Sequence, residues 1–317
     1  MKRFVVTVLA FCLLPLPPLY GLQWIVDQGL RKSNQELLTE WNDIYDGQIN
    51  ADLLIMGSSR AWVHYSPQIL DEELHMNSYN LGIDGWTFPM QWARFKIYLK
   101  YDKAPKIVVQ NLDYFLLIRR PDLFNASQFL PYLSDPDMRT ATKGYKGEFG
   151  TPQYYFPMYK YNSNWVMALT GFLNFFGRGK LLRTKIKGYE GQERDWDGSF
   201  EKFKQENPNG ILQNIDPDVE KEFVDYLRFC HGNGIQVFLV YSPEYIEVQR
   251  MTLNRQEIMV RFQQIANETG SVFLDYSNSQ ISLDRSQFYN SEHLNKTGSE
   301  NFSRLVARDI HEMLLTN

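Results

Sequence analysis

Two short segments, far apart in the chain, carry residues that together can perform nucleophilic catalysis. Ser59 lies in a Gly-Ser-Ser-Arg stretch that starts at Gly57, directly after the apolar run at residues 53–56. His293 lies far downstream in the polar stretch at residues 290–295. A serine can attack an acyl carbon when a histidine takes its proton, a third group orients the imidazole and N–H donors hold the oxyanion.

Each motif also has a simpler interpretation when it is taken alone. Gly-Ser-Ser is typical of a plain turn or of a phosphate-binding nest, and a single loop histidine is most often structural. The two motifs strengthen each other only if the fold brings Ser59 and His293 together. The elements that position them therefore decide between these interpretations.

The sequence around both motifs alternates between strand-like and helix-like patterns, which is typical of a parallel sheet covered by helices on both faces. We therefore expect an α/β fold, a flavodoxin-like three-layer sandwich with a central parallel sheet of about five strands. The expected strands are residues 53–56, 78–81, 107–109, 236–240 and 272–274. The expected helices are residues 67–74, 90–101, 217–230, 254–269 and 296–315.

Functional groups of open α/β sheets gather at the carboxyl ends of the strands. The segments that come after the predicted strands should therefore meet at one edge of the sheet, although they are far apart in sequence. These segments are residues 57–60, 82–86, 111–113, 242–244 and 275–293. Ser59 and His293 both belong to this set.

With this order of motifs, the chain resembles the SGNH (GDSL-like) hydrolase superfamily over residues 51–113 and 217–315. It looks most like the membrane-anchored, extracytoplasmic branch that works beside membrane-bound O-acyltransferases. The alginate O-acetylation proteins and the D-alanyl-transfer protein of teichoic acids are members of that branch. The resemblance implies that Ser59 is the nucleophile and that His293 is the general base.

The resemblance also implies two donors for the oxyanion. The family glycine, whose backbone N–H faces the oxyanion, matches Gly82, which comes after Asn80 and Leu81. The family asparagine, whose side chain does the same, matches Asn111 loosely, and Asp113 is an alternative occupant of that pocket. The N–H of Ser59 would complete the set.

One position departs from the family pattern, because the expected Asp-x-x-His reads Asn290 to His293. An asparagine can orient the imidazole but gives an imidazolium no charge, and replacing a triad acid by its amide can cost about ten-thousand-fold in rate. Three outcomes are then open. The enzyme runs on a Ser–His dyad with Asn290 as orienter, another acid such as Asp284 or Glu292 substitutes, or catalysis is lost and binding remains.

Two charged residues next to the expected crevice are candidate substrate contacts. Arg60 comes directly after the nucleophile and can either contact an anionic substrate or pair with an acid beneath the turn. Glu244 ends the fourth predicted strand and can line the crevice, or serve as an acid at a helix N-terminus.

Composition bounds the partners and cofactors. The 317 residues are 44% hydrophobic and 22% charged, as in folded globular proteins. A net charge of −4 without a long basic stripe argues against a nucleic-acid partner. The five histidines and two cysteines show no ligand spacing, and no dinucleotide fingerprint is present, so we expect no metal and no cofactor.

Residues 1–26 are predicted to be an N-terminal membrane anchor or signal segment. Lys2 and Arg3 precede a long apolar run, which favours export of the rest of the chain, and the missing small-x-small cleavage site favours an anchor over a cleaved signal. Residues 27–50 are expected to form a polar linker. Residues 51–317 would form the SGNH-like domain, with an aromatic-rich lid inserted at residues 119–210 and partly helical around residues 165–176.

Together these features predict a membrane-anchored serine esterase or O-acyltransferase that faces the periplasm or cell exterior. Its substrate would be an acyl ester, most simply acetyl, on a cell-surface polysaccharide, with a membrane-bound O-acyltransferase as a candidate partner. Asn290 favours the alternative of a non-catalytic polymer-binding or docking subunit. A phosphate- or nucleotide-binding flavodoxin-like domain agrees with the expected fold but leaves the late histidine unexplained.

Overall fold

The computed structural model describes residues 1–178 and 183–316, and the chain divides into two compact units. Unit 1 comprises Met1–Asp46 and Pro121–Thr184, and unit 2 comprises Gly47–Arg120 and Lys185–Asn317. The expected insertion at residues 119–210 is therefore divided between them. Its aromatic helix belongs to unit 1, whereas residues 185–210 belong to unit 2.

Unit 2 is built on a five-stranded parallel sheet in the order β2-β1-β3-β4-β5. Ile55 of the central strand pairs with Asn80 on one side and with Val109 on the other. This strand order is that of flavodoxin-like folds. The expected α/β class with a central parallel sheet of five strands is confirmed. The strands are β1 (Leu53–Met56), β2 (Ser78–Asn80), β3 (Ile107–Leu112), β4 (Gln236–Tyr241) and β5 (Val272–Asp275).

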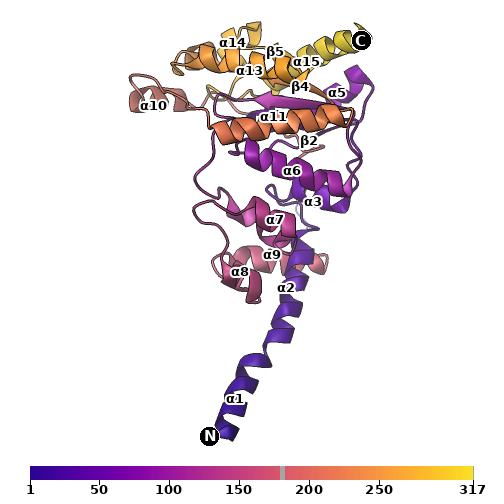
Figure 1. Ribbon diagram of the computed structural model, residues 1–317, viewed down its shortest axis with the longest axis vertical. Helices are drawn as coiled ribbons and strands as arrows, with labels where there is room; N and C mark the ends of the chain where they lie inside the picture. The colour runs from indigo at the N-terminus through magenta and orange to yellow at the C-terminus, as the bar shows by residue number, and fades with distance from the viewer. Residues whose placement is uncertain (179–182, 317) are drawn as a thin grey trace. The chain divides into compact units, whose positions relative to one another are not determined.

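Helices cover both faces of this sheet (Figure 1). Helices α4 (Ser59–His64), α5 (Pro67–Leu74) and α15 (Lys296–Thr316) pack together on one face. The other face carries α6 (Phe88–Tyr101) and α11 (Pro217–Gly232), with α13 (Arg255–Thr269) next to α11 and β5. The shorter helices are α10 (Ser199–Glu206), α12 (Ile246–Gln249), α14 (Gln280–Leu283) and η3 (Arg285–Gln287).

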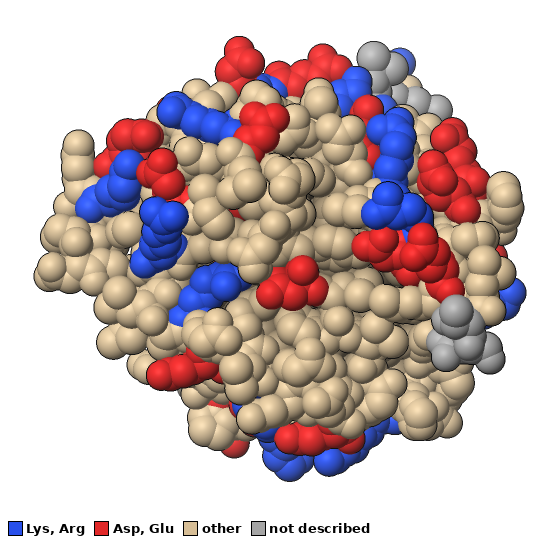
Figure 2. Space-filling view, turned by 90° about the horizontal axis from the view of Figure 1, so that it is seen from above, with Lys and Arg blue, Asp and Glu red and all other residues tan. Residues whose placement is uncertain are grey.

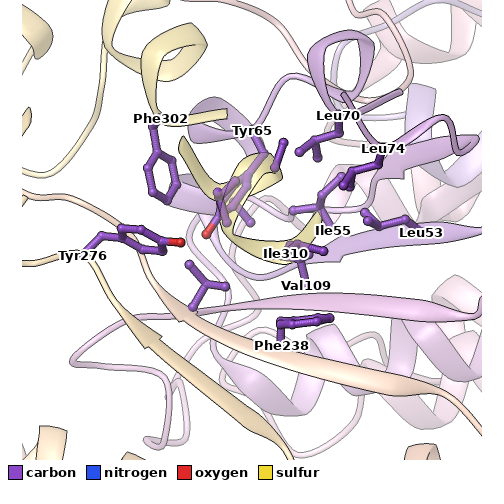
Figure 3. Packing of buried hydrophobic residues seen from close by; sticks show 14 of the residues in the cluster. Leu53, Ile55, Tyr65, Leu70, Leu74, Val109, Phe238, Tyr276, Phe302 and Ile310 are labelled. Carbon is purple, nitrogen blue, oxygen red and sulfur yellow. The ribbon is translucent and has the colours of Figure 1, made fainter. Parts of the chain in front are cut away.

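The core beneath α15 fixes the two helices that frame the candidate site (Figure 3). Alternate residues of a strand face the same side of a sheet, so Leu53 and Ile55 both enter this core. Tyr65, just after α4, meets Phe302 of α15 edge to face at 5.1 Å between ring centroids. The loop that precedes α15 is thereby held close to the start of α4.

Unit 1 is helical. Residues 27–50, expected as a linker, include the end of α2 (Leu16–Leu30) and all of α3 (Thr39–Asp46). The fully buried Trp41 of α3 donates its ring N–H to Gln128 at 3.0 Å. Among the described residues, one helix, Lys2–Leu30, is long and apolar enough to cross a membrane. The elements are α1 (Lys2–Leu13), α2 (Leu16–Leu30), α3 (Thr39–Asp46), η1 (Ala126–Tyr132), α7 (Pro136–Ala141), α8 (Thr151–Tyr155), η2 (Tyr159–Tyr161) and α9 (Trp165–Phe175).

The turn that leads from β1 into α4 accepts only glycine at its first position. Gly57 has a φ of +148°, a conformation that residues with a Cβ rarely adopt. A Cβ added there would lie 2.7 Å from the Cβ of Ala61 and 2.8 Å from the Cβ of Asn111. Gly57 therefore lets α4 start immediately above β3.

We expect Gly57→Ala to destabilise unit 2, because overpacking alone costs about 1–3 kcal/mol and backbone strain adds to it. The matched control is Gly232→Ala at the end of α11, where an added Cβ meets no atom within 4 Å and helix propensity favours alanine. Chemical denaturation monitored by circular dichroism compares the two variants. Equal stability of both variants would contradict this account of the turn.

Candidate active site

The structure brings Ser59 and His293 into hydrogen-bonding contact. Ser59 is the first residue of α4, and His293 lies in the loop between η3 and α15. The Nε2 atom of His293 lies 2.8 Å from the Oγ of Ser59. Both side chains remain partly exposed, so a ligand can reach the pair.

Asn290 orients the imidazole through one oxygen atom. Its Oδ1 accepts the backbone N–H groups of Glu292 at 3.1 Å and His293 at 2.9 Å, and it lies 3.0 Å from Nδ1 of the His293 ring. An amide oxygen is only an acceptor, so the ring proton must sit on Nδ1. Nε2 is then left without a proton and faces the Ser59 hydroxyl, which is the tautomer that a general base requires.

A second histidine holds the backbone next to His293. The Nε2 of His64 accepts the N–H of Leu294 at 3.1 Å, so its Nδ1 carries the proton and donates to the Oγ of Ser242 at 2.9 Å. His64 is fully buried, and burial lowers the pKa of its imidazole well below the usual value. Sequence reasoning missed this role, and its one available signal was the position of His64 at the end of the helix that Ser59 starts.

Beneath the turn, Arg60 forms the centre of a buried ionic cluster. Its guanidinium lies 3.3 Å from Asp113 Oδ1 and 3.6 Å from Glu244 Oε2, and it donates to the backbone oxygen of Ser242. Arg60 is 1% exposed and Glu244 is equally buried. The pairing expected as one option for Arg60 is therefore the one observed. Neither Arg60 nor Glu244 reaches the surface as a substrate contact.

This buried cation influences the candidate base. Burial, assisted by the positive charge of Arg60, lowers the pKa of His293 to about 4, and the carboxylate of Asp197 opposes the shift. Burial raises the pKa of Asp113 to about 6, against the attraction of Arg60. His293 is therefore neutral at neutral pH and can accept a proton from Ser59.

The structure does not present the two oxyanion donors that the sequence suggested. The N–H of Gly82 is donated to the side-chain Oδ1 of Asn80 at 2.9 Å. Strand β3 continues through Leu112, so Asn111 lies inside it, fully buried, and accepts the hydroxyl of Tyr65 at 2.8 Å. The N–H of Ser59, as the first residue of α4, has no acceptor within the helix.

The acids proposed as substitutes for the triad carboxylate are engaged elsewhere. Asp284 is exposed and accepts from the N–H of Ser286 at 3.0 Å and from its hydroxyl at 2.7 Å. Glu292 accepts the hydroxyl of Tyr114 at 2.6 Å. The geometry is therefore that of a Ser–His pair with Asn290 as orienter, rather than that of a pair with a substitute acid.

Part of the expected insertion lines the His293 loop within unit 2. The N–H of Asp197 donates to the backbone oxygen of Tyr289 at 2.8 Å, and the ring of Tyr289 stacks on that of His293 with centroids 5.5 Å apart. A surface groove of about 540 Å³ runs along this segment, and its wall carries both signs of charge. Acidic and basic side chains are likewise interspersed on the face shown in Figure 2. The groove is lined by Gln192, Glu193, Arg194, Asp195, Asn295, Lys296, Thr297 and Glu300.

Other reactive groups lie away from this site. Within residues 1–178 and 183–316, no three His, Cys, Asp or Glu side chains gather closely enough to hold a metal ion. Cys230 is buried in α11 with a free thiol, and burial raises its pKa to about 12.

The chain matches no family model and no curated protein. Among solved structures it is similar to a Bacteroides fragilis protein provisionally assigned as an acylhydrolase, with 15% identity, a TM-score of 0.35 and coverage of 82% of this chain and 87% of that one. It is also similar to a GDSL-like lipase of Bacteroides thetaiotaomicron, with 12% identity, a TM-score of 0.36 and coverage of 83% and 88%. Both TM-scores are below 0.5, so neither structure assigns a role to any residue of this chain.

We expect Arg60→Met to cost about 3–5 kcal/mol of stability, because it leaves the carboxylate of Asp113 buried without its cation and leaves Glu244 with Arg255 alone. The matched control is Arg308→Met, where an exposed ion pair with Asp309 is lost at a cost below about 1 kcal/mol. Denaturant titration measures both changes. A loss in Arg60→Met no larger than in the control would contradict the structural role of the cluster.

Proposed function

We propose that this chain is a serine-dependent esterase or O-acyltransferase of the SGNH (GDSL-like) type. The observation that carries the proposal is the 2.8 Å contact between Ser59 Oγ and His293 Nε2, with the imidazole oriented by Asn290. Such a pair, placed at the carboxyl end of a parallel sheet and open to ligand, is what nucleophilic acyl transfer requires.

In the first half of the reaction, Ser59 Oγ bonds to the acyl carbon while its proton passes to His293 Nε2. The carbonyl oxygen becomes an oxyanion, which the N–H of Ser59 can stabilise. When the tetrahedral intermediate collapses, the ester C–O bond breaks and Nε2 returns the proton to the departing alcohol. The product is an acyl ester on Ser59.

In the second half, His293 takes a proton from an incoming hydroxyl group, which attacks the acyl-serine. The bond to Ser59 breaks and the proton returns to Oγ, so the site is regenerated. Water as the incoming group gives hydrolysis, and a sugar hydroxyl gives transfer. The outcome depends on how far water is excluded from the site.

For substrate and location, we propose an acetyl ester on a cell-surface polysaccharide, handled outside the cytoplasm. The groove beside the His293 loop is lined by basic and amide side chains that can donate hydrogen bonds and by acidic side chains that can accept them. Such a lining suits the hydroxyl groups of an uncharged sugar. The helix Lys2–Leu30 can tether the chain, and the basic residues at its start favour export of the rest. A membrane-bound O-acyltransferase would be the partner that the family resemblance implies.

The second candidate is a non-catalytic polymer-binding or docking subunit, and a specific observation favours it. Asn290 gives the imidazolium no charge, and the pKa of His293 is only about 4. A proton taken from Ser59 would therefore be held weakly. In this alternative the same groove binds polymer without turning it over.

The first test is turnover of 4-nitrophenyl acetate by the full chain in detergent. We expect Ser59→Ala and His293→Ala each to lower kcat/KM by about a thousandfold or more, because the pair acts as a unit. Ser199→Ala, at an exposed serine that starts α10, is the matched control and should leave activity unchanged. Activity that survives Ser59→Ala would refute the assignment, and an inactive wild type would favour the binding subunit.

The second test uses pH and Asn290→Asp. A base is active only above its pKa, so kcat/KM of the wild type should rise near pH 4 and then stay level towards neutrality. The aspartate places a negative charge about 3 Å from Nδ1 and stabilises the imidazolium, which moves the acidic limb upward by at least about one pH unit and raises the plateau at least about tenfold.

The matched control for this test is Asp284→Asn, which removes an exposed carboxylate from the same region without touching the imidazole. Its pH profile should coincide with that of the wild type. If Asn290→Asp leaves the acidic limb where it was, His293 is not the base that the profile reports. Activity that appears only in Asn290→Asp would identify the wild type as the binding subunit.

A further inference from the structure

Helix α9 of unit 1 exposes a continuous apolar face. Its sequence is almost wholly apolar, and the exposed residues recur at helical spacing. Trp165 is 69% exposed and Phe172 is 36% exposed, although side chains of this kind are normally buried in soluble proteins. The exposed face consists of Trp165, Val166, Leu169, Phe172, Leu173 and Phe176, the last directly after the helix end.

The opposite face of α9 is packed tightly on α2. A Cβ added to Gly29 would lie 1.7 Å from the backbone oxygen of Gly171, and one added to Gly171 would lie 2.6 Å from the backbone oxygen of Val26. The two backbones therefore touch at a crossing that only glycine permits. Trp24 meets Phe175 edge to face with centroids 5.6 Å apart.

The point of contact coincides with the end of the apolar span. Residues 4–26 contain no charged side chain. Twenty helical residues rise about 30 Å, the thickness of the hydrocarbon core, so a span that begins near Phe4 ends near Trp24. The first charge after it, Asp27, is paired with Lys160 at 2.8 Å and also accepts the hydroxyl of Tyr161.

More aromatic residues gather at the same level of the helix. Tyr20 donates its hydroxyl to the backbone oxygen of Tyr155, and Gln23 accepts the N–H of Met158 at 2.7 Å. Tyr155 and Phe156, at the end of α8, are largely exposed. Tryptophan and tyrosine are typical of the boundary between hydrocarbon and headgroups.

From these contacts, and resting on the proposed membrane anchoring, we propose that the exposed face of α9 lies in the membrane interface, where it is covered by the acyl chains and headgroups of the bilayer that would hold residues 4–24. Unit 1 then lies at the membrane surface, next to the anchor. The bilayer fits better than a protein partner, because the same helix that packs α9 also carries the span and fixes α9 at its boundary. An apolar helix face at that depth is buried without any further protein.

Spin labels on the full chain in liposomes of phosphatidylethanolamine and phosphatidylglycerol can test the proposal. Labels go on Phe172→Cys in α9, Leu9→Cys in the span and Phe229→Cys in α11 of unit 2, in a Cys12→Ala background. Phe172 and Phe229 are matched in type and exposure, at 36% and 39%. Cys230 stays, because it is buried and its raised pKa keeps the thiol unreactive.

Collision with oxygen and with a polar nickel chelate is measured at each label. We expect oxygen to exceed nickel at positions 9 and 172 and the reverse at position 229. Nickel in excess at 172 overturns the proposal, whether or not position 9 lies in the bilayer. Protection of 172 from both reagents also overturns it, since a protein would then cover α9. Trp165→Cys repeats the measurement if a label at 172 disturbs folding.

Discussion

The site depends on the buried ion pairs that the guanidinium of Arg60 makes. The guanidinium joins the start of α4 to Asp113, just after β3, and to Ser242 and Glu244, just after β4. A charge taken out of water is costly unless its partners surround it, so the three chain segments must keep their relative positions. Ser59 precedes Arg60 directly and is held with it. The same charge helps to keep His293 neutral.

The imidazole itself is positioned from both sides without any carboxylate. Asn290 fixes the ring proton on Nδ1, and His64 holds the N–H of the next residue, Leu294. This arrangement secures the tautomer but leaves the base weak. A base with a low pKa is deprotonated at neutral pH and can accept a proton, yet it drives proton transfer less strongly than a base of higher pKa. An esterase of the proposed kind would therefore suit esters whose alcohol leaves easily.

The sequence was sufficient to predict the sheet and the contact between Ser59 and His293. Both follow from the alternation of strands with helices and from the rule that functional residues lie at the carboxyl ends of parallel strands. The oxyanion donors could not be predicted in the same way, because they depend on where a strand ends and on which side chains compete for a backbone N–H. Strand β3 runs on through Asn111, which turns that side chain into the core, and the Asn80 side chain competes for the N–H of Gly82. Burial of Arg60 is a tertiary property that no local pattern encodes.

The close packing of α9 on α2 also constrains any motion of unit 1. At the crossing of Gly29 and Gly171 the two backbones are in contact, and the ion pair of Asp27 with Lys160 fixes the segment just before α9 to the same helix. A lid that swings over a site must leave its resting contacts at little cost. Helix α9 can leave its contacts only if these backbones separate and the buried ion pair breaks. It must therefore move with α2 as one body, and α2 is itself the second half of the apolar segment that the membrane would hold.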